Sequence, residues 1–281
     1  MNNIDNIFIL IIFVFSKGIV LMNMVKLLII TEILLIIGGN FCIYSNPKVL
    51  SIMEKMDKIE KFNSDITVKL ILTETRVNQG VMEHEGIFYR RDSDDAYLII
   101  MTSPESEKGN GYLRVKNSMW MYRQNTRTFQ LMARGQSIEG SDADVAELES
   151  RKYVDLYEPE LDKAGNEMIF EETLGKAKIP VYRFKVKAKI KDIDYRLKEY
   201  WVRKDNFLKL KEQAFSRSGT LVETCYYLKY TQINGKYICI KQLFIDEFEK
   251  GNKTLLDLSG ISLHSIDKGI FTKAYLENLS K

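Results

Sequence analysis

The densest group of ionisable side chains in this sequence is the stretch GSDADVAELES, at residues 140–150. It places Asp142, Asp144, Glu147 and Glu149 within eight consecutive positions. Carboxylates at this density could bind a metal ion, begin a capped helix, or act as an acid–base pair in a hydrolase, with Asp142 and Glu147 as the pair. The aspartate spacing resembles a calcium loop only weakly, because the later glycine and the twelfth-position glutamate are missing.

Helix-start chemistry accounts for most of these carboxylates. Ser141 suits the N-cap position, where its hydroxyl accepts a bond from the backbone N–H of Asp144 and the aspartate returns the bond. Asp142 and Asp144 would then lie at the positive end of the helix dipole. Val145 and Leu148, three positions apart, give this helix a small apolar stripe. We therefore predict a short helix in this stretch and no catalytic carboxylate.

Other chemical signatures are sparse. The two histidines, His84 and His264, have no cysteine or second histidine at ligand spacing, so we expect ordinary strand histidines. The sequence has no glycine-rich phosphate loop, no GxSxG motif and no CxxC pair. We therefore predict no catalytic residue, no metal and no cofactor. The net charge of +3, from 41 basic and 38 acidic side chains, provides no basic field for nucleic acid.

The N-terminal region differs from the rest of the chain. Two apolar runs, Ile7–Phe15 and Leu27–Gly39, are each shorter than the roughly 20 residues that a membrane-spanning helix needs. A start at Met22 or Met24 would give a short basic region, an apolar segment and a cleavage point after Ser45. We predict an export signal here, with an uncleaved membrane anchor formed by both runs as the alternative.

The domain organisation follows from this division. We predict an export or anchor segment at residues 1–45 and a single domain at residues 46–281, which contain no low-complexity linker. The domain begins with a predicted amphipathic helix at Asn46–Phe62. Its apolar residues recur at helical spacing and are Val49, Leu50, Met53, Met56 and Ile59.

Short alternating segments follow and predict about eleven antiparallel strands. They include Asp65–Arg76, Gly86–Arg91, Ala96–Met101, Gly111–Val115, 118–123, 128–132 and Val181–Ile190, with further strands up to residue 263. A sheet of this width curls toward a barrel or half-barrel. The predicted fold is mainly β: one curved antiparallel sheet that forms an incomplete β-barrel, with short helices over its concave apolar face. Phe271–Leu279 predicts a short C-terminal helix or tail.

Tight turns determine which side chains share a face of the sheet. A two-residue turn at Lys116-Asn117 pairs Leu113 with Trp120, and the next hairpin pairs Tyr122 with Phe129. One face therefore carries Leu113, Val115, Trp120, Tyr122, Phe129 and Leu131. The opposite face carries Met119, Met121, Arg123, Gln130 and Met132, and is less polar than a solvent-exposed face usually is.

The turn INGK, at residues 233–236, fixes the register around the cysteines of the domain. A two-residue turn there places Cys225 opposite Phe244 and Cys239 opposite Tyr230. The two sulfur atoms are then too far apart to bridge. We expect two buried thiols and no disulfide.

Aromatic residues make up 11% of the chain, and many fall on the apolar face of the predicted sheet. Tyr182, Phe184 and Val186 add to this face from a strand whose alternate positions are lysine and arginine. A concave face lined with Trp, Tyr, Phe, Met and Leu suits a flexible acyl chain, because apolar burial is non-directional.

An ordered set of motifs resembles a known family. PESEKGNGYLRV (104–115), NSMWMYRQNTRTFQLMARGQ (117–136) and GSDADVAELE (140–149) resemble the outer-membrane lipoprotein-sorting proteins related to the periplasmic lipoprotein carriers LolA and LolB. The resemblance extends over Ser64–Leu279. It departs from the family pattern at Gln124, where a proline is usual, and at the small residues Ala143 and Val145.

The resemblance implies an incomplete β-barrel with the helix after Gly140 as part of a lid over an apolar cavity. The cavity would be lined by Leu113, Val115, Trp120, Tyr122, Phe129, Leu131, Tyr182, Phe184 and Val186. The lid would carry Ser141, Asp144, Val145 and Leu148. Members of this family carry lipoprotein acyl chains or other lipids, and some are associated with lipid exporters.

We therefore predict a non-catalytic, monomeric periplasmic carrier of lipoprotein or lipid acyl chains. Its expected partners are an inner-membrane exporter and an outer-membrane acceptor, and if the N-terminus is not cleaved it is anchored to the inner membrane. The alternative on the same scaffold is a regulatory sensor that signals lipoprotein state to a membrane partner, for which the Met119, Met121 and Met132 face is the candidate contact surface.

Overall fold

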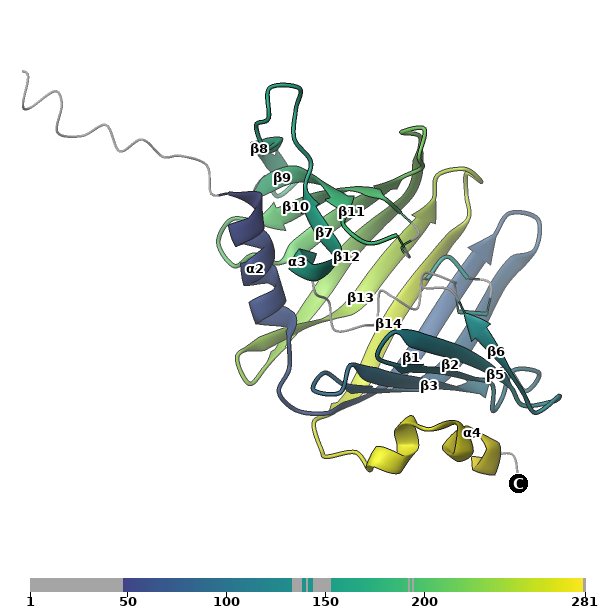
Figure 1. The fold of residues 1–281 in the computed structure, drawn as a ribbon. Helices are drawn as coiled ribbons and strands as arrows, with labels where there is room; N and C mark the ends of the chain where they lie inside the picture. The colour runs from purple at the N-terminus through teal and green to yellow at the C-terminus, as the bar shows by residue number, and fades with distance from the viewer. Residues whose placement is uncertain are drawn as a thin grey trace, which may run out of the picture. The chain divides into compact units, whose positions relative to one another are not determined.

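Alternation along the chain produces one antiparallel sheet of fourteen strands in the computed structural model (Figure 1). The structure describes residues 48–132, 138–139, 141–143, 153–191, 193 and 195–279. All of them belong to one compact unit, Pro47–Lys281. The predicted export segment at residues 1–45 lies outside the described residues, and so do Asp144, Val145, Glu147 and Leu148 of the predicted lid helix.

The strands fall into two consecutive series. The first series comprises β1 (Ile66–Arg76), β2 (Gly80–Arg91), β3 (Ala96–Ser103), β4 (Gly111–Val115), β5 (Ser118–Arg123) and β6 (Thr128–Met132). The second comprises β7 (Tyr157–Pro159), β8 (Ile169–Leu174), β9 (Ile179–Ala188), β10 (Leu197–Arg203), β11 (Lys209–Phe215), β12 (Leu221–Ile233), β13 (Lys236–Asp246) and β14 (Lys253–Ser262). β1 pairs with β14, so the first and last strands join the two series at the middle of the sheet.

The sheet order runs β6-β5-β4-β3-β2-β1-β14-β13-β12-β11-β10-β9-β7, and β8 pairs with β9. The sheet is not closed, which confirms the predicted incomplete barrel. The predicted number of strands was too low. β7 has only three residues, and β8 has no fully buried side chain, so neither segment has the alternation by which a half-buried strand is recognised.

Short helices lie against both faces of the sheet (Figure 1). Helix α2 (Val49–Glu60), which confirms the predicted amphipathic helix, and the one-turn α3 (Tyr153–Leu156) lie on the face that we call the inner face. The 3-10 helix η2 (Lys268–Phe271) and α4 (Lys273–Leu279) lie on the opposite, outer face. α2 buries Val49, Ile52, Met53 and Met56 against the sheet. No helix of the described residues has the length and apolar character needed to cross a membrane.

The predicted registers are confirmed. Leu113 pairs with Trp120 and Tyr122 pairs with Phe129, as the two-residue turns require. In the INGK turn, Asn234 and Gly235 both have positive φ, 51° and 74°, which is the type I′ geometry of a two-residue hairpin.

This turn places the cysteines as predicted. Cys225 lies opposite Phe244 and Cys239 lies opposite Tyr230. Cys225 is buried, whereas Cys239 is only half-buried, so the expectation that both thiols are buried was wrong for Cys239.

Candidate functional site

The inner face of the first strand series is a broad apolar surface. The cross-strand pairs Val68–Phe88, Phe88–Ile99 and Tyr112–Met121 extend it from β1 to β5. β12, β13 and β14 continue the surface. Its buried residues on the first series are Val68, Leu70, Leu72, Phe88, Tyr97, Ile99, Met101, Tyr112, Met119 and Met121, and those on β12–β14 are Cys225, Tyr227, Phe244, Leu256 and Leu258. Because successive side chains of a strand alternate, one register assembles this whole surface.

A segment between β6 and α3 packs on this surface. Its described residues, Ile138, Glu139 and Ser141–Ala143, are here called the cover segment. Ile138 and Ala143 are fully buried in the inner-face cluster. The segment is bent back on itself, since the N–H of Ile138 donates to the carbonyl of Ala143 at 3.1 Å.

Polar contacts fasten one end of the cover segment to β1 and β14. The Arg76 guanidinium donates to Asp142 Oδ1 at 2.6 Å. The Thr254 hydroxyl accepts from the Asp142 N–H at 3.0 Å and donates to Asp142 Oδ2 at 2.9 Å. Arg76 and Asp142 expose only 18% and 11% of their side chains, so this ion pair is partly shielded from solvent. Burial lowers the pKa of Arg76, but the hydrogen bonds and charges of Asp142 and Glu74 together raise it above its usual value, so the guanidinium stays charged.

Glu139 fastens the other end of the cover segment. Its carboxylate accepts from Arg123 at 2.9 Å and from the Asn110 amide at 3.3 Å. Its backbone N–H donates to the Tyr112 hydroxyl at 2.8 Å. Burial raises the pKa of this tyrosine well above its usual range, which keeps the hydroxyl neutral. The cover segment is thus held by two ionic contacts and by burial of two apolar residues.

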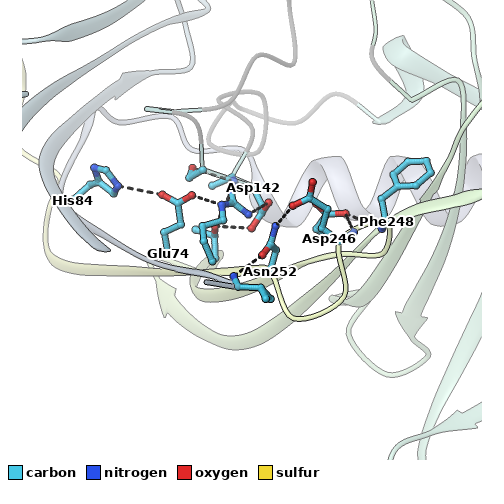
Figure 2. Close-up of polar contacts among 12 residues, drawn as sticks. Glu74, His84, Asp142, Asp246, Phe248 and Asn252 are labelled. Carbon is cyan, nitrogen blue, oxygen red and sulfur yellow. Dashed lines mark hydrogen bonds and ion pairs between the residues drawn. The ribbon is translucent and has the colours of Figure 1, made fainter. Parts of the chain in front are cut away.

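A buried histidine extends this network along the sheet. His84 is 1% exposed, its Nδ1 lies 2.7 Å from Glu107 Oε2, and its Nε2 lies 3.4 Å from Glu74 Oε2. Glu74 also pairs with Arg76, so an unbroken chain of contacts links Glu107 to Asp142. Figure 2 shows the part of this chain from His84 to Asp142. Both ring nitrogens of the histidine therefore lie next to a carboxylate.

A second polar cluster lies under α2 and α3. Lys209, 1% exposed, pairs with Glu212, which also pairs with Lys198. The Lys209 ammonium lies 4.7 Å from the ring centroid of Tyr200 and 4.5 Å from that of Tyr227. Burial raises the pKa of Tyr200, so its hydroxyl also stays neutral. These charges are compensated inside the fold, which suits a structural cluster.

A family model whose description reads "-like: Uncharacterized protein" matches residues 93–278, more than half of the chain. A solved LolA superfamily protein of Nitrosomonas europaea has 20% sequence identity and a TM-score of 0.69, and the match covers 82% of this chain and 99% of that one. The chain belongs to the family that this model describes, and its fold is LolA-like. The resemblance predicted from the sequence is therefore confirmed.

Two further solved structures support the LolA-like fold. A putative outer membrane lipoprotein-sorting protein domain of Vibrio parahaemolyticus has 16% identity and a TM-score of 0.70, covering 81% of this chain and 97% of that one. A DUF1329 family protein of Desulfovibrio piger has 20% identity and a TM-score of 0.69, with the same shares covered. None of the curated proteins matches this chain significantly.

The LolA-like sheet divides the predicted cavity residues between its two faces. Leu113, Val115, Trp120, Tyr122 and Phe129 lie on the outer face in a cluster with Ile266, Phe271 and Leu276. Leu131 lies on the same face and is 69% exposed. Tyr182, Phe184 and Val186 instead lie on the inner face, in the cluster with α2. The nine residues therefore do not line one cavity, because alternation identifies which side chains share a face but not toward which face the sheet curves.

The structure places Ser141 in the cover segment, where its hydroxyl accepts from the N–H of Ala143 at 3.2 Å. Its predicted partner Asp144 lies outside the described residues. Sequence reasoning missed the role of Asp142, which contacts Arg76 rather than only beginning a helix. It also missed most of the inner-face residues, although the apolar Met119, Met121 and Met132 positions were the signal for them.

Proposed function

We propose that this protein is a non-catalytic periplasmic carrier that binds acyl chains of lipoproteins or other lipids on the inner face of its sheet. The observation that carries the proposal is the continuous apolar inner face of an open LolA-like sheet, covered there by a short segment. Burial of each acyl methylene contributes about 0.8 kcal/mol, so a chain of a dozen carbons has ample driving force.

Binding would require the cover segment to give way. Of its described residues, two apolar side chains are fully buried, Ile138 and Ala143, and its ends are held by ion pairs that water can replace. An acyl chain entering beneath it would exchange these contacts for contacts with the methionine and aromatic side chains of β3–β5. Release would follow at a membrane acceptor, after loading from an inner-membrane exporter.

The alternatives have less support. The contact surface proposed for a sensor is not available, because Met119 and Met121 are only 6% and 8% exposed. For a hydrolase, Asp142 would have to be available for proton transfer. Its carboxylate oxygens instead accept from Arg76 and Thr254, so both are engaged in holding the cover segment.

Neighbouring residues of β6 allow a matched test. Met132 faces the inner cluster, whereas Leu131 faces outward and is 69% exposed. We expect Met132→Glu to weaken binding of a fluorescent fatty acid at least about tenfold, a loss of about 1.4 kcal/mol, because it puts a charge where the chain would lie. Leu131→Glu should bind like the unchanged protein.

Native mass spectrometry of the purified protein provides the second measurement. Co-purified lipid or lipoprotein acyl chains are expected in the unchanged protein and in Leu131→Glu. Equal binding by both variants, or no acyl-probe binding by the unchanged protein, would refute the proposal.

A further inference from the structure

Two hairpin turns at one end of the sheet carry exposed apolar side chains. Val77, Val81 and Met82, in and beside the β1–β2 turn, are 50%, 69% and 54% exposed. Phe248, in the β13–β14 turn, is 66% exposed. We call these four residues the apolar tips. Large apolar side chains grouped on protruding turns are unfavourable in water and mark an interaction surface.

The two turns are joined to each other. The N–H of Val77 donates to Asn252 Oδ1 at 3.0 Å, which crosses from the first turn to the second. The turns also pack closely, since a Cβ added to Gly251 would lie 2.6 Å from Val77 Cγ2. The two turns that carry the apolar tips are therefore fixed to each other rather than independent.

The acidic side chains of the second turn are directed into the turn. Asp246 Oδ1 accepts from the N–H groups of Phe248 and Glu249, at 2.7 and 3.0 Å. Glu249 Oε2 accepts from the Asn252 amide at 2.7 Å. Figure 2 shows the Phe248 ring directed away from these polar contacts and from Asp142.

Basic side chains flank the same turn. Lys250 and Lys253 are both exposed, whereas Glu247 is half-buried and accepts from the Thr224 hydroxyl at 2.5 Å. Glu83, which follows Met82 in β2, is an exposed acid on the first hairpin. Apolar tips with adjacent lysines match the surface of a bilayer, whose interior accepts apolar side chains and whose anionic headgroups attract cations.

We propose that the apolar tips dock the protein on a lipid bilayer. Exposed apolar side chains on turns can insert into the boundary between headgroups and acyl chains. The surface adjoins the site already described, because Arg76, which precedes Val77, binds Asp142 of the cover segment. Docking would bring this edge of the inner face to the membrane, and in this respect the inference rests on the proposed carrier function.

A tryptophan introduced at the surface reports its insertion. In the full-length protein, Phe248→Trp is mixed with vesicles of phosphatidylethanolamine and phosphatidylglycerol that contain brominated acyl chains. The matched control is Phe170→Trp, an equally conservative change at a half-exposed residue of β8, several strands away. After subtraction of the unchanged protein, we expect quenching in the Phe248→Trp variant to be at least about twofold stronger than in the Phe170→Trp variant.

A second variant separates docking from proximity. Adding Val77→Ser, Val81→Ser and Met82→Ser to Phe248→Trp should reduce the quenching to the control level while thermal unfolding stays unchanged, since these residues are exposed. Equal quenching in the two tryptophan variants, absence of quenching in both, or quenching that survives the serine changes would overturn the proposal. Fatty-acid binding is measured on the same variants and should persist. If the variants bind no fatty acid while the tryptophan of Phe248→Trp is quenched, the proposed carrier function is wrong and the docking proposal is retained.

Discussion

The ion pair between Arg76 and Asp142 provides a direct test of how the cover segment is held. Asp142→Asn keeps the side-chain shape and the contacts with Thr254 but removes the charge that Arg76 meets. The reciprocal change, Arg76→Met, removes the guanidinium. Each change should loosen the cover segment, because the pair is partly shielded from solvent.

The magnitude follows from the partners that remain. Hydrogen bonds to charged groups contribute about 1.5–3 kcal/mol. Arg76 retains its contact with Glu74, and Asp142 retains its contact with Thr254. We therefore expect the loss of the ion pair to cost about 2 kcal/mol, which is about 30-fold in the equilibrium for opening of the cover segment. The exposed pair Arg203–Asp205 is the control, and removing it should cost less than about 1 kcal/mol.

Amide hydrogen exchange measures the opening locally. The N–H of Glu139 donates to the Tyr112 hydroxyl and that of Asp142 to the Thr254 hydroxyl, so both exchange only when the segment leaves the sheet. We expect both amides to exchange about 30-fold faster in either variant, and the double variant to add little more. A change below about threefold, with strand amides unaffected, would show that the pair does not hold the segment.

Three further predictions concern the packing and the buried charges. Gly111→Ala should destabilise the protein by about 1–3 kcal/mol in urea unfolding, because the added Cβ would clash with Leu276 Cδ2. The same change should speed amide hydrogen exchange in α4, and unchanged exchange there would contradict the prediction. Glu212→Gln should lower the free energy of unfolding by about 3 kcal/mol, since it deprives the buried Lys209 of its carboxylate. A loss below about 1 kcal/mol would show that other groups balance the charge of Lys209. Burial raises the pKa of Asp57 from 3.8 to about 6, so the folded state binds this proton more tightly than the unfolded state does. The contribution of Asp57 to stability is therefore full below about pH 4 and is lost as the pH rises through about 6. Asp57→Asn should remove about 1 kcal/mol of this pH dependence, a value that allows for the partial solvent exposure of the carboxyl group. An unchanged pH profile of stability would refute this prediction.

The sequence determined local structure well because local rules govern it. Turns of two residues fixed the β4–β5 and β12–β13 registers, and helical spacing identified α2. The β3 segment is apolar at nearly every position, which is consistent with a strand covered on both faces.

Long-range contacts could not be read in the same way. Asp142 contacts Arg76, 66 residues earlier, and no local pattern distinguishes this role from that of a helix-start carboxylate. Strands β4–β6 carry apolar residues on both of their faces. The sequence therefore did not show that Trp120 would lie beneath α4 and Met121 on the inner face. Curvature and the placement of short helices decide this, and both depend on the assembled sheet.

The outer face has a consequence for biosynthesis. The residues that cover Leu113, Tyr122 and their neighbours come from η2 and α4, which the ribosome makes after all fourteen strands. Until those last residues emerge, the sheet has an apolar stripe with nothing on it, and such surfaces attract chaperones and proteases. A chain that stops after β14 would keep this stripe bare. A chain without η2 and α4 is therefore expected to be recognised as incompletely folded.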